Sequence, residues 1–207
     1  MQRARIISLA ALFLLWFNLL PQMAAQGGVG SSHIIYQNNA NEHLIHLYGT
    51  SGTWNYDDLT ALTGAPGSAN GGMSSFSDSL GLHVFYPGGG SLNHVYQLYW
   101  QASSSTWQPA QDLTAATGGP TNAFFTTSFA DSTGEHVFYP ANNNTGNPSH
   151  IHHLCGCSGR WTDQDLTVVS RATVQFSGVG LSSFVDSLGE HVFYTATDSH
   201  IHQTLRS

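Results

Sequence analysis

Short apolar runs alternate with polar turns along most of the chain. In the text "HVFY" at residues 83–86, alternate side chains point to opposite faces of an extended strand, with His83 and Phe85 on one face and Val84 and Tyr86 on the other. Both faces are substantially apolar, which predicts a strand that is covered on both sides. After residue 25 no window shows a sustained 3.6-residue period. The pattern therefore predicts an all-β fold.

The same strand pattern recurs several times along the chain. The text "SSFSDSLGLHVFY" at 74–86 returns as "TSFADSTGEHVFY" at 127–139 and as "SSFVDSLGEHVFY" at 182–194, and "HIIY" from residue 33 is an earlier copy of its end. We expect the segment between the two strands of each copy to be a tight turn. Gly81, Gly134 and Gly189 are available there for a positive φ.

Each full unit predicts four short strands. These are the Ser-Ser-Phe strand, the His-Val-Phe-Tyr strand, a second strand headed by histidine, and the segment from a tryptophan to Asp-Leu-Thr. Such a four-stranded repeat is typical of a β-propeller blade. The predicted fold class is thus all-β, with about three and a half β-propeller blades. The units lie near 33–73, 74–126, 127–181 and 182–207.

Fourteen strands are expected, because the first unit lacks its first strand and the fourth unit lacks its last. A closed ring usually needs more blades than these. We therefore expect a partial ring or one that is completed by self-association, with an apolar blade face exposed at each end.

The first 25 residues predict a signal peptide. Arg3 and Arg5 precede an apolar run at 6–20, which is short for a membrane span, and a small-residue exit follows. Cleavage after Ala25 leaves a short linker at 26–32 and a secreted or periplasmic chain without a membrane partner. An uncleaved anchor is the alternative.

The net charge of the chain limits the kinds of molecule that it is expected to bind. The sequence contains five arginines, no lysine and twelve acidic residues, for a formal charge of −7. Such a surface repels phosphate backbones, which argues against nucleic-acid binding.

The text "GEHVFYP…SHIHHL…GRWTDQDLT" resembles the blades of the fungal fucose-specific lectins and their bacterial relatives. The resemblance covers roughly residues 33–205. It implies a secreted six- or seven-bladed propeller that binds sugars between adjacent blades. The arginine and glutamate that bond the sugar in that family are absent. The arginine position reads His33, His83, His136 and His191, and the glutamate position reads His46, Gln97, His153 and Gln203.

Imidazole and amide groups still suit neutral sugar hydroxyls, and aromatic rings stack on pyranose faces. Each residue also has a structural alternative, because a repeated histidine can serve blade packing and a tryptophan can fill a core. The candidate carbohydrate-binding residues are His83, His136, His191, Gln97, His153, Gln203, Trp54, Trp107 and Trp161.

The text "HIHHLCGC" at 150–157 has the ligand types of a zinc site. The repeat already accounts for its histidines, so we predict no metal and no other cofactor. Cys155 and Cys157 are expected to be a buried pair, a local disulfide or a link to another chain.

Two sets of aspartates recur at fixed positions in the units, and paired carboxylates can serve a glycosidase. A catalytic site normally breaks a repeat, whereas these do not, so we do not expect an enzyme. The predicted function is a lectin-like, multivalent carbohydrate-binding propeller. The alternative is a structural or protein-interaction propeller without a small ligand. The aspartates are Asp58, Asp112 and Asp165, and Asp78, Asp131 and Asp186.

Overall fold

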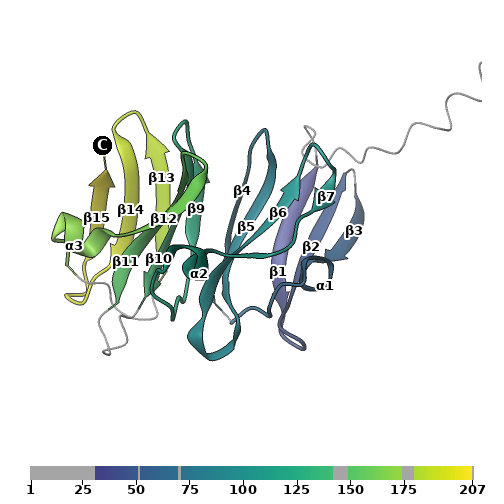
Figure 1. Ribbon diagram of the computed structural model, residues 1–207, viewed down its shortest axis with the longest axis horizontal. Helices are drawn as coiled ribbons and strands as arrows, with labels where there is room; N and C mark the ends of the chain where they lie inside the picture. The colour runs from purple at the N-terminus through teal and green to yellow at the C-terminus, as the bar shows by residue number, and fades with distance from the viewer. Residues whose placement is uncertain (1–30, 51, 70, 142–148, 174–179, 207) are drawn as a thin grey trace, which may run out of the picture.

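A computed structural model describes residues 31–50, 52–69, 71–141, 149–173 and 180–206 (Figure 1). The predicted signal peptide at 1–25 and most of the linker at 26–32 lie outside the described residues. The described part is all-β, as predicted, and forms four antiparallel sheets that follow one another in chain order (Figure 1).

The first sheet contains β1 (Ser32–Asn38), β2 (His43–Thr50) and β3 (Thr53–Asp58). The second contains β4 (Ser74–Ser77), β5 (Gly81–Gly88), β6 (His94–Gln101), β7 (Thr106–Trp107) and β8 (Gln111–Asp112). The third contains β9 (Thr127–Ala130), β10 (Gly134–Ala141), β11 (His150–Cys157) and β12 (Arg160–Asp165). The fourth contains β13 (Leu181–Asp186), β14 (Gly189–Thr195) and β15 (Ile201–Arg206).

The second sheet differs from the third in its last strand. Where the third sheet has the single strand β12, the second has β7 and β8, both of which pair with β6. Pro109 lies between these two pieces. Because proline has no backbone N–H to donate, it interrupts the ladder, and one predicted strand becomes two.

Three short helices follow the outer strands, where the sequence pattern indicated only strand. They are α1 (Leu59–Thr63), α2 (Leu113–Thr117) and α3 (Leu166–Ser170); a 3₁₀ turn, η2, spans Gly90–Leu92. Each α-helix has five residues, too few to show a helical period. Each Asp-Leu-Thr segment therefore marks the beginning of a short helix.

The aspartate of this text caps its helix. Asp112 accepts a hydrogen bond from the Ala115 backbone N–H, and its other carboxylate oxygen lies 2.7 Å from Nδ1 of His94. The Thr114 hydroxyl accepts the Val95 backbone N–H at 3.0 Å. The same three contacts recur in the first and third sheets, at Asp58 and Asp165. These recurring aspartates thus join the outer strand, the helix and the second histidine strand.

The core lies between the sheets and follows the predicted alternation. Val84 and Tyr86 of β5 pack on the first sheet against Leu44. Phe85, between them, packs on the third sheet in a cluster that includes Val137 and Tyr139. All of these side chains are fully buried. The two faces of one strand thus hold two sheet interfaces together.

Tight turns join the first two strands of the second, third and fourth sheets, as expected. Asp131 accepts hydrogen bonds from the backbone N–H groups of Thr133 and Gly134. Gly134 has φ 149°, and a Cβ there would lie 2.6 Å from the Gly156 carbonyl oxygen. Only glycine tolerates that approach.

The outer faces of the two end sheets expose large apolar side chains. On the first sheet Tyr56 is 71% exposed, and on the fourth sheet Ile201 is 79% exposed. This agrees with the expectation of uncovered faces. Further exposed apolar residues on these two sheets are Ile34, Tyr36, Trp54 and Phe184. None of the described helices is long and apolar enough to cross a membrane.

We predict that Asp112→Ala lowers the free energy of unfolding by about 1–2 kcal/mol, because the α2 cap is lost. Chemical denaturation measures the change. Gln111→Ala, at the exposed neighbouring position, is the matched control and should change it by less than about 0.5 kcal/mol. Equal effects of both substitutions would contradict the capping role.

Candidate functional site

The histidine that heads the His-Val-Phe-Tyr strand is buried in the second, third and fourth sheets. In the second sheet, Nε2 of His83 lies 3.3 Å from the Asp78 carboxylate of the preceding turn. Its ring stacks between Phe76 and Tyr99. The amide nitrogen of Gln97, on the next strand, lies 3.2 Å from Nδ1 of His83. The repeated aspartate of the turn thus orients the repeated histidine.

The third sheet repeats this arrangement with a second imidazole. His136 Nε2 lies 3.1 Å from Asp131 and 2.9 Å from the Thr133 hydroxyl. His136 Nδ1 lies 3.0 Å from Nε2 of His153, which takes the place of Gln97. Burial would raise the pKa of Asp131, but hydrogen bonds from Thr133 and the nearby His136 outweigh burial and lower it.

A glutamate from the following sheet reaches each of these two histidines. Glu135 lies 3.2 Å from Nδ1 of His83 and accepts a hydrogen bond from Gln97 at 2.6 Å. Glu190 lies 3.3 Å from Nδ1 of His136. Each cluster therefore spans two sheets and depends on their packing.

The first interface differs. His33 and His46 lie 2.9 Å apart through Nδ1 and Nε2, and the position equivalent to the two glutamates is Leu82. Burial, and then the neighbouring His33, lower the pKa of His46 from 6.5 to about 4. This pair is thus held neutral at physiological pH.

Two of the three predicted stacking tryptophans pack between sheets. Trp107 contacts the ring of His46 edge-on, at 5.6 Å between centroids. Trp161 contacts Phe85 edge-on at 6.2 Å. In both cases the tryptophan of one sheet packs on the sheet before it. Trp54 belongs to the first sheet and is 48% exposed.

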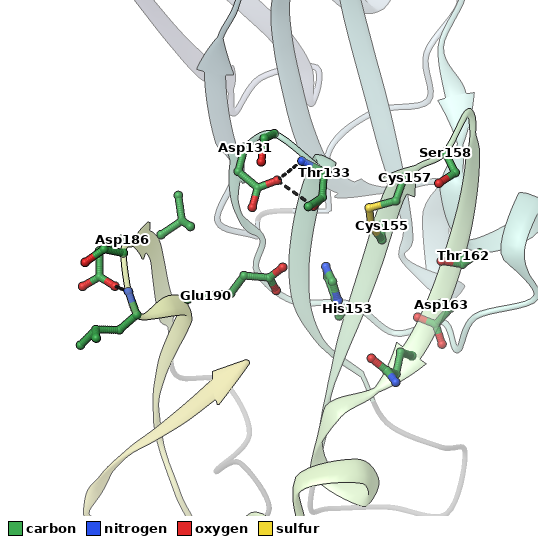
Figure 2. A pocket seen from close by; sticks show the side chains of 16 residues that line it. Asp131, Thr133, His153, Cys155, Cys157, Ser158, Thr162, Asp163, Asp186 and Glu190 are labelled. Carbon is green, nitrogen blue, oxygen red and sulfur yellow. Dashed lines mark hydrogen bonds between the residues drawn. A yellow bond between two sulfur atoms is a disulfide. The ribbon is translucent and has the colours of Figure 1, made fainter. Parts of the chain in front are cut away.

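A pocket of about 1100 Å³ opens between the third and fourth sheets (Figure 2). It lies where His153 and Glu190 approach each other, and its rim comes from the turns at Asp131–Thr133 and Asp186–Gly189. Hydroxyl, carboxylate and amide groups from Thr162, Asp163 and Gln164 form one wall. In the described residues the fourth sheet contributes β13, β14 and the turn between them to this pocket.

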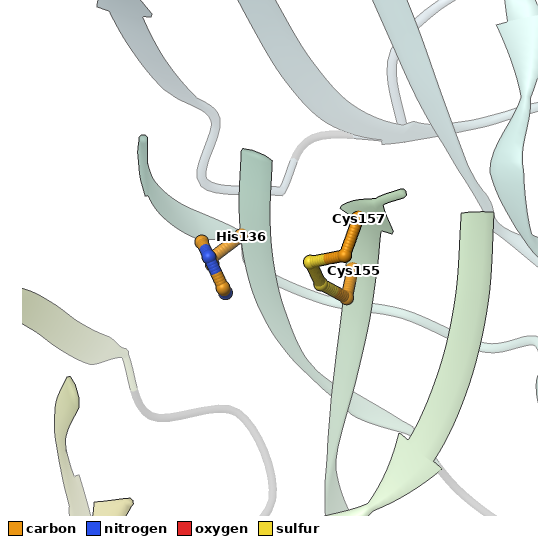
Figure 3. Close-up of side chains that lie close together, drawn as sticks. All are labelled: His136, Cys155 and Cys157. Carbon is orange, nitrogen blue, oxygen red and sulfur yellow. A yellow bond between two sulfur atoms is a disulfide. The ribbon is translucent and has the colours of Figure 1, made fainter. Parts of the chain in front are cut away.

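Cys155 and Cys157 form a disulfide on β11, which is one of the three states that the sequence left open. The disulfide lines the pocket beside His136 (Figure 3). Its sulfurs are oxidised and do not act as thiolate ligands.

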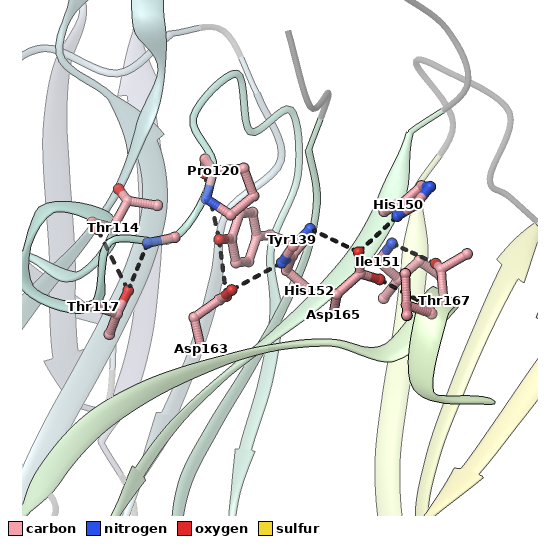
Figure 4. Close-up of polar contacts among 12 residues, drawn as sticks. Thr114, Thr117, Pro120, Tyr139, His150, Ile151, His152, Asp163, Asp165 and Thr167 are labelled. Carbon is pink, nitrogen blue, oxygen red and sulfur yellow. Dashed lines mark hydrogen bonds and ion pairs between the residues drawn. The ribbon is translucent and has the colours of Figure 1, made fainter. Parts of the chain in front are cut away.

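A chain of polar contacts joins β10, β11 and β12 and includes Asp163 of the pocket wall (Figure 4). The Tyr139 hydroxyl donates to Asp163 at 3.1 Å, and Asp163 pairs with Nδ1 of His152 at 3.0 Å. Burial and the Asp163 charge raise the pKa of Tyr139, so the phenol keeps its proton and remains a donor. These residues hold the wall of the pocket in place.

The nine candidate residues do not form one open site. His83, His136, His191, His153 and Gln97 are buried, and Trp107 and Trp161 are partly buried in cores. Gln203 is exposed and lies 2.6 Å from Nδ1 of His191 on the fourth sheet. His153 lines the pocket and contacts the buried His136 behind it, whereas the others lie in separate interfaces or on the end sheets.

The sequence reasoning missed the two glutamates. Their signal was a difference between copies, since "GEHVFY" in the third and fourth units replaces "GLHVFY" in the second. Their role depends on the next sheet, which a single strand pattern does not show.

Comparison of the chain with models of known protein families, with curated proteins and with solved structures finds no match. The likeness to lectin blades therefore stands on the residue pattern alone.

We predict that stability falls as pH drops from about 6.5 towards 4, by up to about 1.4 kcal/mol per pH unit from His46. In this window the unfolded chain binds a proton that the folded His46, with its pKa near 4, does not. Denaturant titrations at several pH values measure the slope. His46→Gln should flatten it, because Gln97 shows that an amide fits this position. An unchanged slope would refute the assignment.

Proposed function

We propose that the four sheets are blades of an exported β-propeller. The support is the strand order. In the third sheet, for example, the strands follow one another in chain order from β9 at one edge to β12 at the other. Inner strands of adjacent units also meet. Ser74 of β4 donates to the Thr126 hydroxyl beside β9, and Thr127 of β9 lies 2.9 Å from the Ser183 hydroxyl of β13. Export is inferred from the apolar segment at 6–20.

We further propose that the protein binds neutral carbohydrate in the pocket between the third and fourth sheets. The observation that carries this proposal is the dense polar lining of a pocket large enough for a small sugar. Serine, threonine and glutamine groups both donate and accept, and carboxylates accept from sugar hydroxyls. Val185, Leu188 and the disulfide supply apolar surface for the C–H face of a ring.

Binding at one such pocket would be weak. Several equivalent interfaces in a ring would raise the avidity without a new contact. In the first two interfaces Trp107 and Trp161 occupy the space, so the third interface is the best candidate in the described residues.

The test is a glycan array probed with the purified protein, followed by titration of the sugars that bind. We expect Ser187→Trp to abolish binding, because Ser187 lies at the rim and an indole would fill the pocket. Ser79→Trp, at the same position of the equivalent turn in the second sheet, is the matched control and should bind as the wild type does. No glycan bound by folded, wild-type protein would refute the proposal.

A protein-interaction scaffold is the second candidate function. It is favoured by the exposed apolar faces of the end sheets and by the burial of the repeated histidines. On this hypothesis the chain associates through those faces.

We predict for this second candidate that sedimentation velocity detects an oligomer that Tyr56→Asp dissociates. Tyr56 is 71% exposed on the outer face of β3, and a charge there opposes burial. Leu62→Asp, at a 58% exposed position on α1, is the control and should leave the oligomer intact. A wild-type monomer at all concentrations would contradict the scaffold hypothesis.

A further inference from the structure

The three sheet interfaces of the described residues carry different side chains at three equivalent positions. The first has His33, His46 and Leu82, and the second has His83, Gln97 and Glu135. The third has His136, His153 and Glu190. At these positions the third interface alone combines two imidazoles with a carboxylate; in the first interface the Asp57 carboxylate lies 3.8 Å from the other ring nitrogen, Nδ1, of His46. His83, Gln97 and Glu135 fill the same positions in the second interface, so a second imidazole is not required to fill them.

We infer that His136, His153 and Glu190 bind a divalent transition-metal ion such as Zn²⁺. Two imidazoles and one carboxylate are a common ligand set for zinc, and they suit calcium and magnesium poorly. The inference is independent of the proposed carbohydrate binding.

The spacing of the ligand atoms fits such an ion. The three atoms lie within 4.8 Å of one another. His136 Nδ1 lies 3.0 Å from His153 Nε2 and 3.3 Å from Glu190 Oε1. Ligands about 2.0–2.1 Å from a tetrahedral zinc are separated by about 3.3 Å. A bound ion would replace the proton that the two imidazoles share.

The surroundings orient the first histidine. His136 Nε2 faces Asp131 at 3.1 Å and Nδ1 faces Glu190 at 3.3 Å, so in the tautomer that carries its proton on Nε2 the lone pair of Nδ1 is directed towards the proposed ion. A carboxylate behind a metal-binding histidine is a recurrent supporting contact. Phe129 stacks on His136 and Phe138 stacks on His153, which limits rotation of both rings.

The cluster is reachable from solvent. His153 and Glu190 line the pocket, so an ion can enter through it and keep a coordination position for water or for a ligand oxygen (Figure 2). Glu190 is only 9% exposed, so its carboxylate is held close to His136 at the inner end of the pocket. Cys155 and Cys157 also lie near His136, but their disulfide leaves no thiolate for the ion.

The test uses the purified protein at pH 7.5, with its disulfide confirmed by thiol titration. After chelation and dialysis, isothermal titration with Zn²⁺ should give one site per chain, and Co²⁺ should give the visible absorption of a tetrahedral complex. His153→Gln should weaken Zn²⁺ binding by at least about 100-fold, because one of three protein ligands is lost. This substitution copies the second interface, so the variant should fold, as circular dichroism would show.

Gln97→His supplies the converse variant. It completes two imidazoles and a carboxylate in the second interface and should raise the stoichiometry from one Zn²⁺ to two. His202→Gln, on the exposed pair with Asp198, controls for unspecific binding by surface histidines and should change nothing.

Several results would overturn the inference. One is the absence of Zn²⁺ binding by the wild type. Another is an unchanged Zn²⁺ affinity in both His153→Gln and Glu190→Gln. A third is loss of binding in the Cys155→Ser/Cys157→Ser double variant with retention in His153→Gln, which would place the ion on sulfur. Failure of Gln97→His to add a site would show that the three side chains do not suffice.

Discussion

The burial of one strand on both faces is the constraint on which the rest of this structure depends. Because Val84 and Tyr86 face one neighbouring sheet and Phe85 faces the other, the second sheet is packed against a partner on either side. The strand begins with a buried histidine, whose polar atoms also need partners. The aspartate of the turn and the residue of the second strand supply them, so the same contacts that satisfy His83 also set the turn and the register.

The residues that repeat along the chain and the residues that distinguish the candidate site are different residues. Residues that recur in three of the four units, such as the helix-capping Asp112 and the turn aspartate Asp78, hold strands, turns and helices together. Residues that vary between units lie where chemistry is concentrated. Glu190 in place of a leucine, and His153 in place of a glutamine, together make the third interface unlike the other two. The departures from a repeat therefore locate its candidate site better than the repeat does.

The histidines illustrate why residue type alone was a poor guide to a binding surface. His83 and His136 have the donors and acceptors that a sugar requires, yet in the folded chain these atoms face the chain itself. Trp107 likewise fills an interface. The open polar surface comes from the repeated turns at its rim and from residues with no repeated text, such as Thr162 and Gln164.

The sequence by itself determined the all-β class, the two-faced strands and the tight turns, because these depend on a two-residue alternation and on glycine at particular positions. It did not show the five-residue helices after Asp-Leu-Thr, which are shorter than the pattern that reveals a helix. Only the tertiary structure decided which side chains meet between sheets. Glu190 and His136 are 54 residues apart in number, and their 3.3 Å contact exists because two separately formed sheets pack face to face.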